Sequence, residues 1–349
     1  AKLRKILMIF LIGVIVSGVI ACLFMVAPCL VIDPAEGSTV SLTQDVADAS
    51  GSMNVLGMFT VGDFPLLFSK SNLMALIVFT VFFGVTVSSL GEKGREIANW
   101  LNNMSLVFYK MVAILMKAAP LGLMAYFANL TGTYGSDLLK SYGRGLLIYY
   151  PTVFVYFFVF LGLYAFIAAG PWGVKHYFKE ILTPALTALG TRSSAAALPM
   201  QLDACDKLGV PRVVSSVVVP VGATCHMDGA CLATIYEIVL CCTLFGHPFR
   251  SIGDYAFALT IAVCASVAVS SVPGGGAAME TMLISSFGFP VIALPVLMMM
   301  TQLFDAGCTL INSCGDTVAS MLVSRFLYGK DWYKRDLNEE LAEAEQNKE

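Results

Sequence analysis

The chain of 349 residues is 57% hydrophobic and only 13% charged, with a mean hydropathy of +0.78. Soluble globular domains carry about 25% charged residues, so this composition excludes an ordinary soluble domain. A formal net charge of −3 argues against a basic phosphate-binding surface, and we expect no nucleic-acid partner. The ten cysteines form no Cys-x-x-Cys pair, and we interpret them as small core residues rather than as zinc ligands or disulfides.

Three long segments carry no charged residue: 6–32, 71–90 and 145–174. A helix rises about 1.5 Å per residue, so crossing a hydrocarbon core about 30 Å thick takes about 20 apolar residues. Each segment reaches that length, and we predict that each spans a membrane. The first is too long for the apolar core of a signal peptide and is interpreted as part of the mature protein.

Basic residues set the predicted orientation. With residue 1 placed in the cytoplasm, the segments that alternate to the inside hold 13 Lys and Arg, and the opposite loops, which include 130–144, hold 4. This bias follows the positive-inside rule. We therefore predict a multi-pass protein of a plasma membrane or bacterial inner membrane, with a cytoplasmic C-terminus. Lys110 and Lys117 interrupt the apolar stretch 104–129 and are expected on one face of a single helix.

From residue 181 onward, small residues and prolines break the apolar segments. The first break is 193–199 (Ser-Ser-Ala-Ala-Ala-Leu-Pro), and the second is 270–276 (Ser-Ser-Val-Pro-Gly-Gly-Gly). The short arms on either side cannot span singly, and irregular backbone at membrane depth is tolerated only where it is buried in protein or lines a cavity. The pattern predicts an all-α polytopic membrane protein with two re-entrant helical hairpins.

Polar residues within these apolar segments are functional candidates, because inserting a charge costs about 2.5–3.5 kcal/mol on insertion scales. The group comprises Arg192, His226, Asp228, Asp305, Asn312 and Asp316. Spacings of seven and four residues place the last three on one helical face. The structural alternative is that the acids pair with Arg192 or with one another between helices. Glu237 and Glu280 are interpreted mainly as structural.

Such residues suit a small solute and a cation held near the middle of the membrane. Half-helices direct their positive N-terminal ends at an anion, and carboxylates and unwound carbonyls hold a cation. Ser193 and Ser194, at the first break, suit a carboxylate, whereas Asp305 suits an ammonium group. A site that offers both is suited to an amino acid.

Four motifs in this order resemble the dicarboxylate/amino acid:cation symporter family, which includes archaeal aspartate transporters, excitatory amino acid transporters and neutral amino acid exchangers. They are Thr-Arg-Ser-Ser-Ala-Ala-Ala-Leu-Pro (191–199), Pro-Val-Gly-Ala-Thr-Cys-His-Met-Asp-Gly (220–229), Val-Pro-Gly-Gly-Gly (272–276) and Asp-Ala-Gly-Cys-Thr-Leu-Ile-Asn-Ser-Cys-Gly-Asp (305–316). The resemblance covers essentially the whole chain and starts at the family's third helix. The family's first two scaffold helices are expected to be absent from this sequence.

The resemblance implies an inverted-repeat elevator transporter in a lipid membrane, assembled as a homotrimer. Mainly scaffold and plain-spanning helices would lie in 1–175, the transport core in 176–328 and a polar tail in 329–349. The second hairpin would be the gate. Roles carried over from the family give Asp305 the substrate ammonium and Asn312 and Ser194 its carboxylate. Further contacts would come from Ser193, Thr309 and the gate backbone at Val272 and Gly276.

Two departures from the family bear on the substrate. Members that carry acidic substrates have Arg where this chain has Cys308 and Thr where it has Ala230. A desolvated carboxylate without its bidentate partner loses several kcal/mol, so we expect a small neutral amino acid such as alanine, serine or threonine. The alternative is a sodium- or proton-coupled symporter of acidic amino acids or dicarboxylates, in which Arg192 reaches the second carboxylate.

Other departures bear on the coupling ion, which the sequence leaves open between Na⁺ and H⁺. His226 replaces an amide oxygen that helps coordinate sodium, and Phe10, Gly13 and Val14 replace a tyrosine and two hydroxyl residues. Sodium prefers oxygen ligands, so one family site is expected to be lost. A second would keep the Gly222 carbonyl, Asn312 and Asp316. The gate site would use carbonyls of Thr224, Ser266 and Val267.

His226, beside Asp228 or Asp316, is therefore a candidate carrier of a proton or a fixed positive charge. The alternative is a neutral His226 within a site still driven by sodium. No other cofactor is expected.

An intramembrane enzyme is disfavoured because the protease motifs Gly-x-Ser-Gly and Gly-x-Gly-Asp are missing. A passive channel is the other rival, and saturable counter-exchange would distinguish a carrier from a pore.

Overall fold

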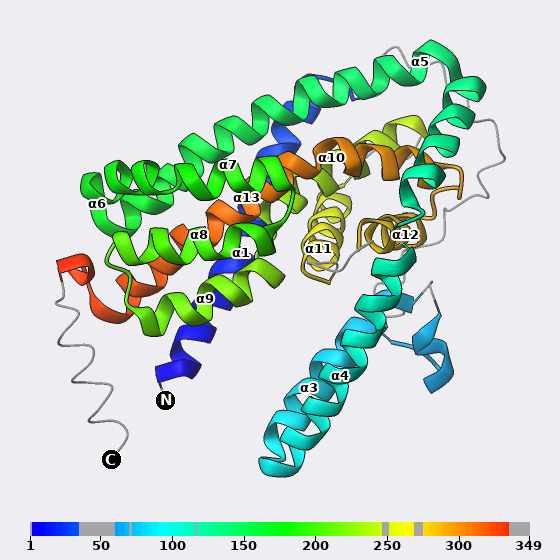
Figure 1. Ribbon diagram of the computed structural model, residues 1–349. Coiled ribbons are helices and arrows are strands. Elements are labelled where there is room, and N and C mark those ends of the chain that lie inside the picture. Colours follow the sequence, from blue (N-terminus) through cyan, green and yellow to red (C-terminus); the bar gives the residue numbers. More distant parts are fainter. Residues whose placement is uncertain are drawn as a thin grey trace.

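The computed structural model describes residues 2–34, 60–69, 72–115, 117–245, 251–268 and 275–334. Within these ranges the chain is helical and has no strand, as Figure 1 shows. The predicted all-α membrane fold is confirmed at this level. The elements of the first part are α1 (Lys2–Val31), the 3-10 helix η1 (Phe64–Phe68), α3 (Leu73–Ser89), α4 (Glu92–Leu115) and α5 (Ala119–Val155).

The second part begins with a π-helical turn and ends in a short 3-10 helix. Its elements are η3 (Tyr156–Phe160), α6 (Leu161–Glu180), α7 (Leu182–Thr191), α8 (Ser194–Lys207), α9 (Arg212–Cys225), α10 (Asp228–Leu244), α11 (Ile252–Ala268), α12 (Gly275–Phe287), α13 (Ala293–Tyr328) and η4 (Trp332–Lys334).

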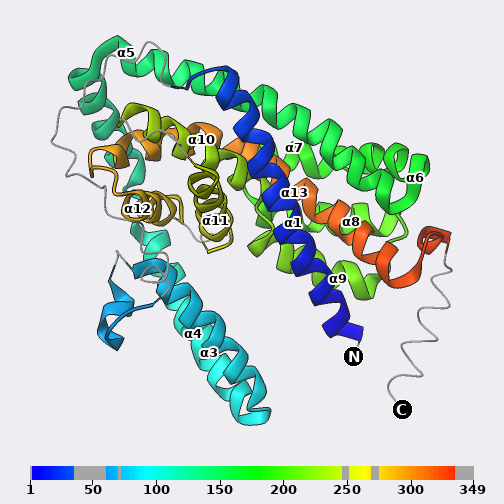
Figure 2. The same ribbon diagram turned by 180° about the vertical axis from the view of Figure 1, so that it is seen from behind.

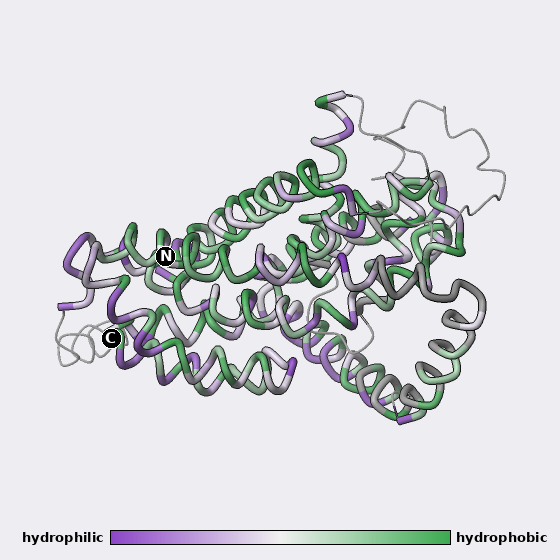
Figure 3. Tube along the Cα trace, turned by 90° about the horizontal axis from the view of Figure 1, so that it is seen from above, coloured by the Kyte–Doolittle hydropathy of each residue, from purple (hydrophilic) through white to green (hydrophobic). Residues whose placement is uncertain are grey.

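Four segments of the described chain are long and apolar enough to cross a membrane: Lys2–Val31, Tyr142–Glu180, Arg212–Leu244 and Ala293–Tyr328. The spans predicted at 6–32 and 145–174 match the first two. The segment predicted at 71–90 becomes α3, which has 17 residues. Figure 3 shows hydrophobic residues along most of the helical length. Outward apolar side chains on α1, such as Ile12 and Ile15, suit contact with lipid.

The first predicted hairpin is present as two short helices, α7 and α8, with a break at Arg192 and Ser193. Arg192 ends α7 in the left-handed conformation, with φ of 52°. Ser193 begins α8 as its N-cap, and its hydroxyl accepts a hydrogen bond from the Ala196 N–H at 3.3 Å. In the second hairpin, α11 and α12 flank residues 269–274, which lie outside the described residues.

Helix α13 is uninterrupted over 36 residues, which is about 54 Å. It packs against α6, α7, α8, α9 and α10, and α1 crosses both α10 and α13 on the side seen in Figure 2. By contrast, α9 and α10 are separated by two non-helical residues, His226 and Met227. The interrupted pair α9 and α10 therefore packs against the continuous helix α13.

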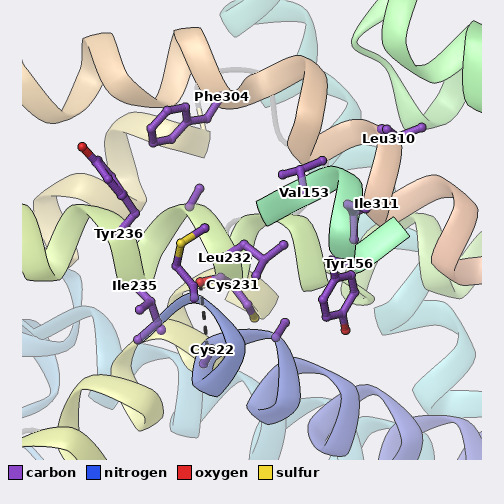
Figure 4. Packing of buried hydrophobic residues seen from close by; sticks show 14 of the residues in the cluster. Cys22, Val153, Tyr156, Cys231, Leu232, Ile235, Tyr236, Phe304, Leu310 and Ile311 are labelled. Atoms are coloured by element: carbon purple, nitrogen blue, oxygen red, sulfur yellow. Dashed lines mark hydrogen bonds between the residues drawn. The ribbon is translucent and has the colours of Figure 1, made fainter. Parts of the chain in front are cut away.

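The core between α1, α5, α10 and α13 is packed with aromatic rings and cysteines (Figure 4). The Tyr149 and Phe304 rings stack at 4.0 Å, and the Tyr236 and Phe304 rings meet edge-on at 5.2 Å. All ten cysteines are free, seven of them buried and three partly buried. Their expected role as small core residues is confirmed.

Two expectations for the first part were wrong. The stretch 104–129 is not one helix, because α4 ends at Leu115 and α5 starts at Ala119 with Pro120 in its first turn. Lys110 lies in α4 and Lys117 lies in the connection, so they do not share a helical face. Residues 130–144, which were expected to form a loop, lie within α5.

The element after α13 is held to α6 by Trp332. This side chain is fully buried, and its indole N–H donates to the Ala168 carbonyl at 2.9 Å. We expect Trp332→Ala to lower the free energy of unfolding by about 3–5 kcal/mol, since it removes a buried aromatic side chain. Trp332→Phe keeps a ring, loses only the hydrogen bond and should cost less. Thermal unfolding in detergent measures both.

Lys334→Ala is the matched control, because the Lys334 side chain is 64% exposed. It should change the unfolding free energy by less than about 0.5 kcal/mol. Equal unfolding temperatures for the Trp332→Ala and wild-type proteins would show that this contact does not stabilise the fold.

Candidate functional site

The polar stripe predicted on α13 faces the break between α9 and α10. Asp316 is fully buried and Asn312 is 6% exposed, whereas Asp305 is only partly buried. The Asn312 amide oxygen accepts the Gly229 N–H at 2.8 Å, and its NH₂ group lies 3.1 Å from the Met227 sulfur. Asn312 thus fixes the start of α10 against α13.

His226 lies between two carboxylates, the two that the sequence offered as alternative neighbours. Its Nδ1 is 3.2 Å from Asp316 Oδ1, and its Nε2 is 3.4 Å from Asp228 Oδ2. All three side chains are at least 95% buried. The edge of the Phe10 ring meets the imidazole, with ring centres 6.1 Å apart. An aromatic ring therefore occupies the α1 side of this cluster, where the family has a tyrosine by resemblance.

Two further polar side chains complete the cluster, and neither was predicted from the sequence. Ser17 on α1 places its hydroxyl 3.1 Å from His226 Nε2 and donates to Asp228 Oδ1 at 2.9 Å. The Tyr156 hydroxyl donates to Asp228 Oδ2 at 2.9 Å. Ser17 was detectable as a hydroxyl inside an uncharged span. Tyr156 gave no such signal, because it lies among many aromatic residues.

Glycines allow the broken and continuous helices to approach each other. A Cβ on Gly222 would collide with the Asp316 carboxylate, and a Cβ on Gly229 would collide with the Cys308 carbonyl. A Cβ on Gly315 would lie 2.7 Å from His226 Cε1. The close contact of α9 and α10 with α13 therefore depends on the absence of side chains at three positions.

Cys308 is held in a small network rather than left free. Its sulfur lies 3.0 Å from the Tyr149 hydroxyl and 3.3 Å from the Gly229 carbonyl. The Tyr149 hydroxyl also donates to the same carbonyl at 3.2 Å. Position 308 thus contributes a neutral thiol that joins α5, α10 and α13. Tyr149 was not predicted from the sequence.

The first hairpin faces α13 through hydroxyl and amide groups. The Ser313 hydroxyl is 3.3 Å from the Ser194 hydroxyl, and buried Gln201 donates to the Ser313 carbonyl at 2.7 Å. The charges of Arg192 and Asp305 lie close enough to interact. The hairpin tip and the stripe on α13 therefore meet, as the sequence predicted, and the structural alternative of an Arg192–Asp305 pairing is compatible with the same geometry.

The remaining predicted residues are distributed around this centre. Thr309 is buried on α13, and Ala230 is partly buried in the first turn of α10. Thr224 is exposed near the end of α9, and its hydroxyl bonds to the Val221 carbonyl at 2.7 Å. Ser266 is buried near the end of α11, followed by Val267, and Gly276 lies in the first turn of α12. Val272 lies outside the described residues.

The oxygens predicted to hold sodium are partly used by protein donors. The Gly222 carbonyl accepts the His226 backbone N–H at 2.8 Å, and the Asn312 amide oxygen accepts the Gly229 N–H. Asp316 Oδ1 faces the imidazole, while its Oδ2 has no hydrogen-bond partner. In the part of the chain that the structure describes, no group of three or more His, Cys, Asp or Glu side chains has the arrangement of a metal site.

Comparison with known proteins identifies several relatives. The C4-dicarboxylate transport protein of Bacillus subtilis (strain 168) is 27% identical over 259 residues, which cover 74% of this chain and 61% of that protein. The protein of the same name from Rhizobium leguminosarum is 28% identical over 298 residues, 84% of this chain and 65% of that protein. A third, from Rhizobium leguminosarum bv. trifolii (strain WSM2304), is 30% identical over 74% of this chain and 58% of its own length.

The chain thus spans less than two thirds of the length of each of these relatives. The model of the sodium:dicarboxylate symporter family matches residues 1–326. With its four apolar spans, the chain is part of a multi-pass membrane protein. Because the family match runs from the first residue to the last turn of α13, the chain belongs to the sodium:dicarboxylate symporter family.

Proposed function

We propose that this chain acts in secondary active transport of a small carboxylate solute, a dicarboxylate or an acidic amino acid. The observation that carries the proposal is the contact of the first hairpin with α13, where the Ser194 and Ser313 hydroxyls lie 3.3 Å apart. The exposed Arg192, at the tip of this hairpin, is near enough for its charge to act on Asp305. The relatives named C4-dicarboxylate transport proteins support this substrate class. They do not support the small neutral amino acid expected from the sequence, and the dicarboxylate alternative fits them better.

In this proposal one carboxylate of the solute lies near the Ser194 and Ser313 hydroxyls, at the N-terminal end of α8. A helix N-terminus favours an anion there. The second carboxylate reaches Arg192. Asp305, beside Arg192, balances the guanidinium charge while the site is empty of solute and accepts an ammonium group when the solute has one. The elevator movement, the gate at the second hairpin and the homotrimer stay part of the proposal.

The second candidate substrate is a small neutral amino acid such as alanine or serine. Cys308 favours it, because the thiol is neutral and is already bonded to Tyr149 and Gly229. A pocket wall built this way offers no cation to a second carboxylate. The two candidates therefore differ in whether Arg192 contacts the solute.

Arg192→Gln tests the choice of substrate. If Arg192 binds the second carboxylate, removing it should weaken succinate or aspartate binding by more than about tenfold, equal to ~1.4 kcal/mol. Alanine binding should change little. The measurement is competition by succinate, aspartate and alanine in proteoliposomes containing the full-length protein.

Cys308→Ser is the matched control, since it keeps a small neutral group at the neighbouring wall. It should leave the order of the three solutes unchanged. Saturable exchange of alanine, unaffected by Arg192→Gln and without competition from succinate, would overturn the carboxylate proposal and favour the second candidate.

We further propose that His226 supplies, as a proton on its ring, the positive charge that a sodium ion would otherwise bring. Ser17 gives its hydrogen to Asp228 or to the Val14 carbonyl, so its oxygen faces His226 Nε2 as an acceptor. Asp316 Oδ1 faces Nδ1. Both ring nitrogens thus meet acceptors, which suits the doubly protonated imidazolium. The two ionised carboxylates together carry a charge of −2, so an imidazolium between them gives the cluster a net charge of −1.

His226→Asn tests this role. An amide cannot hold the proton, so the two carboxylates should recruit a cation from solution, and transport should become dependent on sodium. Its dependence on pH between 5 and 8 should weaken. The measurement is uptake in sodium and in choline across that pH range.

His176→Asn is the control, because His176 stacks on Trp172 and bonds within α6, away from the cluster. It should leave the ion dependence as in the wild type. An unchanged ion requirement in His226→Asn would favour the other interpretation, a neutral histidine in a site driven by sodium.

A further inference from the structure

A second polar site lies apart from the His226 cluster, where α10, α12 and α13 meet. Glu237 on α10 is fully buried, and Glu280 on α12 is 1% exposed. The Thr301 hydroxyl on α13 donates to Glu237 Oε1 at 2.9 Å, and Glu280 lies near the same hydroxyl. The two carboxyl groups lie close enough for their charges to repel. Neither has a role in the transport site described above.

Neither carboxyl group has hydrogen-bond partners for both of its oxygens. Glu237 Oε2 and Glu280 Oε2 are buried without a hydrogen-bond partner. No Lys, Arg or His of the described chain pairs with either one. The other titratable groups near Glu237 are neutral phenols and thiols. They are Tyr149 on α5, Tyr236 and Cys241 on α10, and Cys308 on α13.

No positive charge from the described elements acts on either glutamate directly. Arg144 on α5 and Cys29 on α1 interact with Tyr236, and Cys264 on α11 interacts with Cys231. Along α12, Glu280 has the apolar, buried neighbours Met279, Met282 and Leu283, and the partly buried Thr281 follows it. Two ionised carboxylates in such surroundings would each be buried unpaired, which is costly enough that a group neutralises instead.

The number of hydrogens available for hydrogen bonds leads to the same conclusion, that one of the two carboxyl groups is protonated. A threonine hydroxyl has one hydrogen, and Thr301 gives it to Glu237. An ionised Glu280 is an acceptor only, so it could not bond to the same hydroxyl. A protonated Glu280 can donate to the Thr301 oxygen, and the chain Glu280–Thr301–Glu237 is then satisfied. One proton on Glu280 removes the repulsion between two negative charges and supplies the donor that the ionised group lacks.

We propose that Glu237, Thr301 and Glu280 form a proton-binding site, which holds at least one proton while α12 is packed against α10 and α13. Release breaks the carboxyl O–H bond, gives the proton to water and leaves a second buried negative charge. The resulting repulsion drives α12, the second arm of the gate hairpin, away from α10. This site does not depend on which solute is carried, nor on the role of His226.

The test is infrared spectroscopy of the full-length protein in lipid bilayers, which detects the C=O stretch of a protonated carboxylic acid. Glu237→Gln/Glu280→Gln should lose part of that band at pH 7, relative to the wild type. Asp203→Asn, at an exposed carboxylate paired with Lys207, should keep the whole band. Identical bands in the double variant and the wild type would overturn the proposal.

A second measurement is the unfolding temperature between pH 5 and 9. A site protonated in the folded protein loses stabilisation as pH rises, because free carboxyls ionise above about pH 4. The wild type should therefore lose several degrees more than the double variant over this range. If the double variant does not fold, the single variant Glu280→Gln, compared with Thr301→Val, answers the same question.

A comparison of sodium chloride with choline chloride distinguishes a proton site from a metal-cation site. If sodium chloride raises the unfolding temperature of the wild type relative to choline chloride, and the double variant abolishes that difference, the pair binds a metal cation and the proton assignment is wrong. Equal unfolding temperatures in the two salts for both proteins agree with a proton site.

Discussion

The contact of one imidazole with two carboxylates is the constraint on which the rest of the site depends. His226 sits where helix α9 has ended and α10 has not begun, so its backbone is free to direct the ring between Asp228 and Asp316. A buried carboxylate requires a partner, and three helices provide one another's partners here. Removing the imidazole would leave two buried carboxylates without the basic group between them. The break, the uninterrupted α13 and the crossing helix α1 are therefore held together by the same electrostatic requirement.

The sequence predicted the parts of this arrangement that local patterns specify. Spacing along one helix placed Asn312 and Asp316 together, and small residues and prolines marked the break at Arg192 and Ser193. It did not predict Ser17, Tyr149 or Tyr156, because their importance comes from partners 72 to 211 residues away in the chain. The helix boundary within 104–129 was not predicted, for a related reason. Pro120 starts a new helix within a stretch of apolar residues that only Lys110 and Lys117 interrupt.

Helix α13 connects the two polar sites of the molecule. Asp316 and Asn312 serve the histidine cluster, and Thr301, several turns earlier, serves the glutamate pair. Because this helix has no break, a change of charge at either site acts on the same rigid element. The two sites also differ in kind. The histidine cluster contains a basic side chain, whereas the glutamate pair has none among the described residues.

The glycine contacts have a consequence for how such proteins diverge. A methyl group at position 222 and a carboxylate at position 316 cannot occupy the same space, and neither can a methyl group at 315 and the imidazole at 226 without a shift of the backbone. Each pair of positions is thus free to vary only jointly. A descendant that gains a side chain at 222 must move or shorten residue 316, so the spacing of these two helices and the carboxylate at 316 change together.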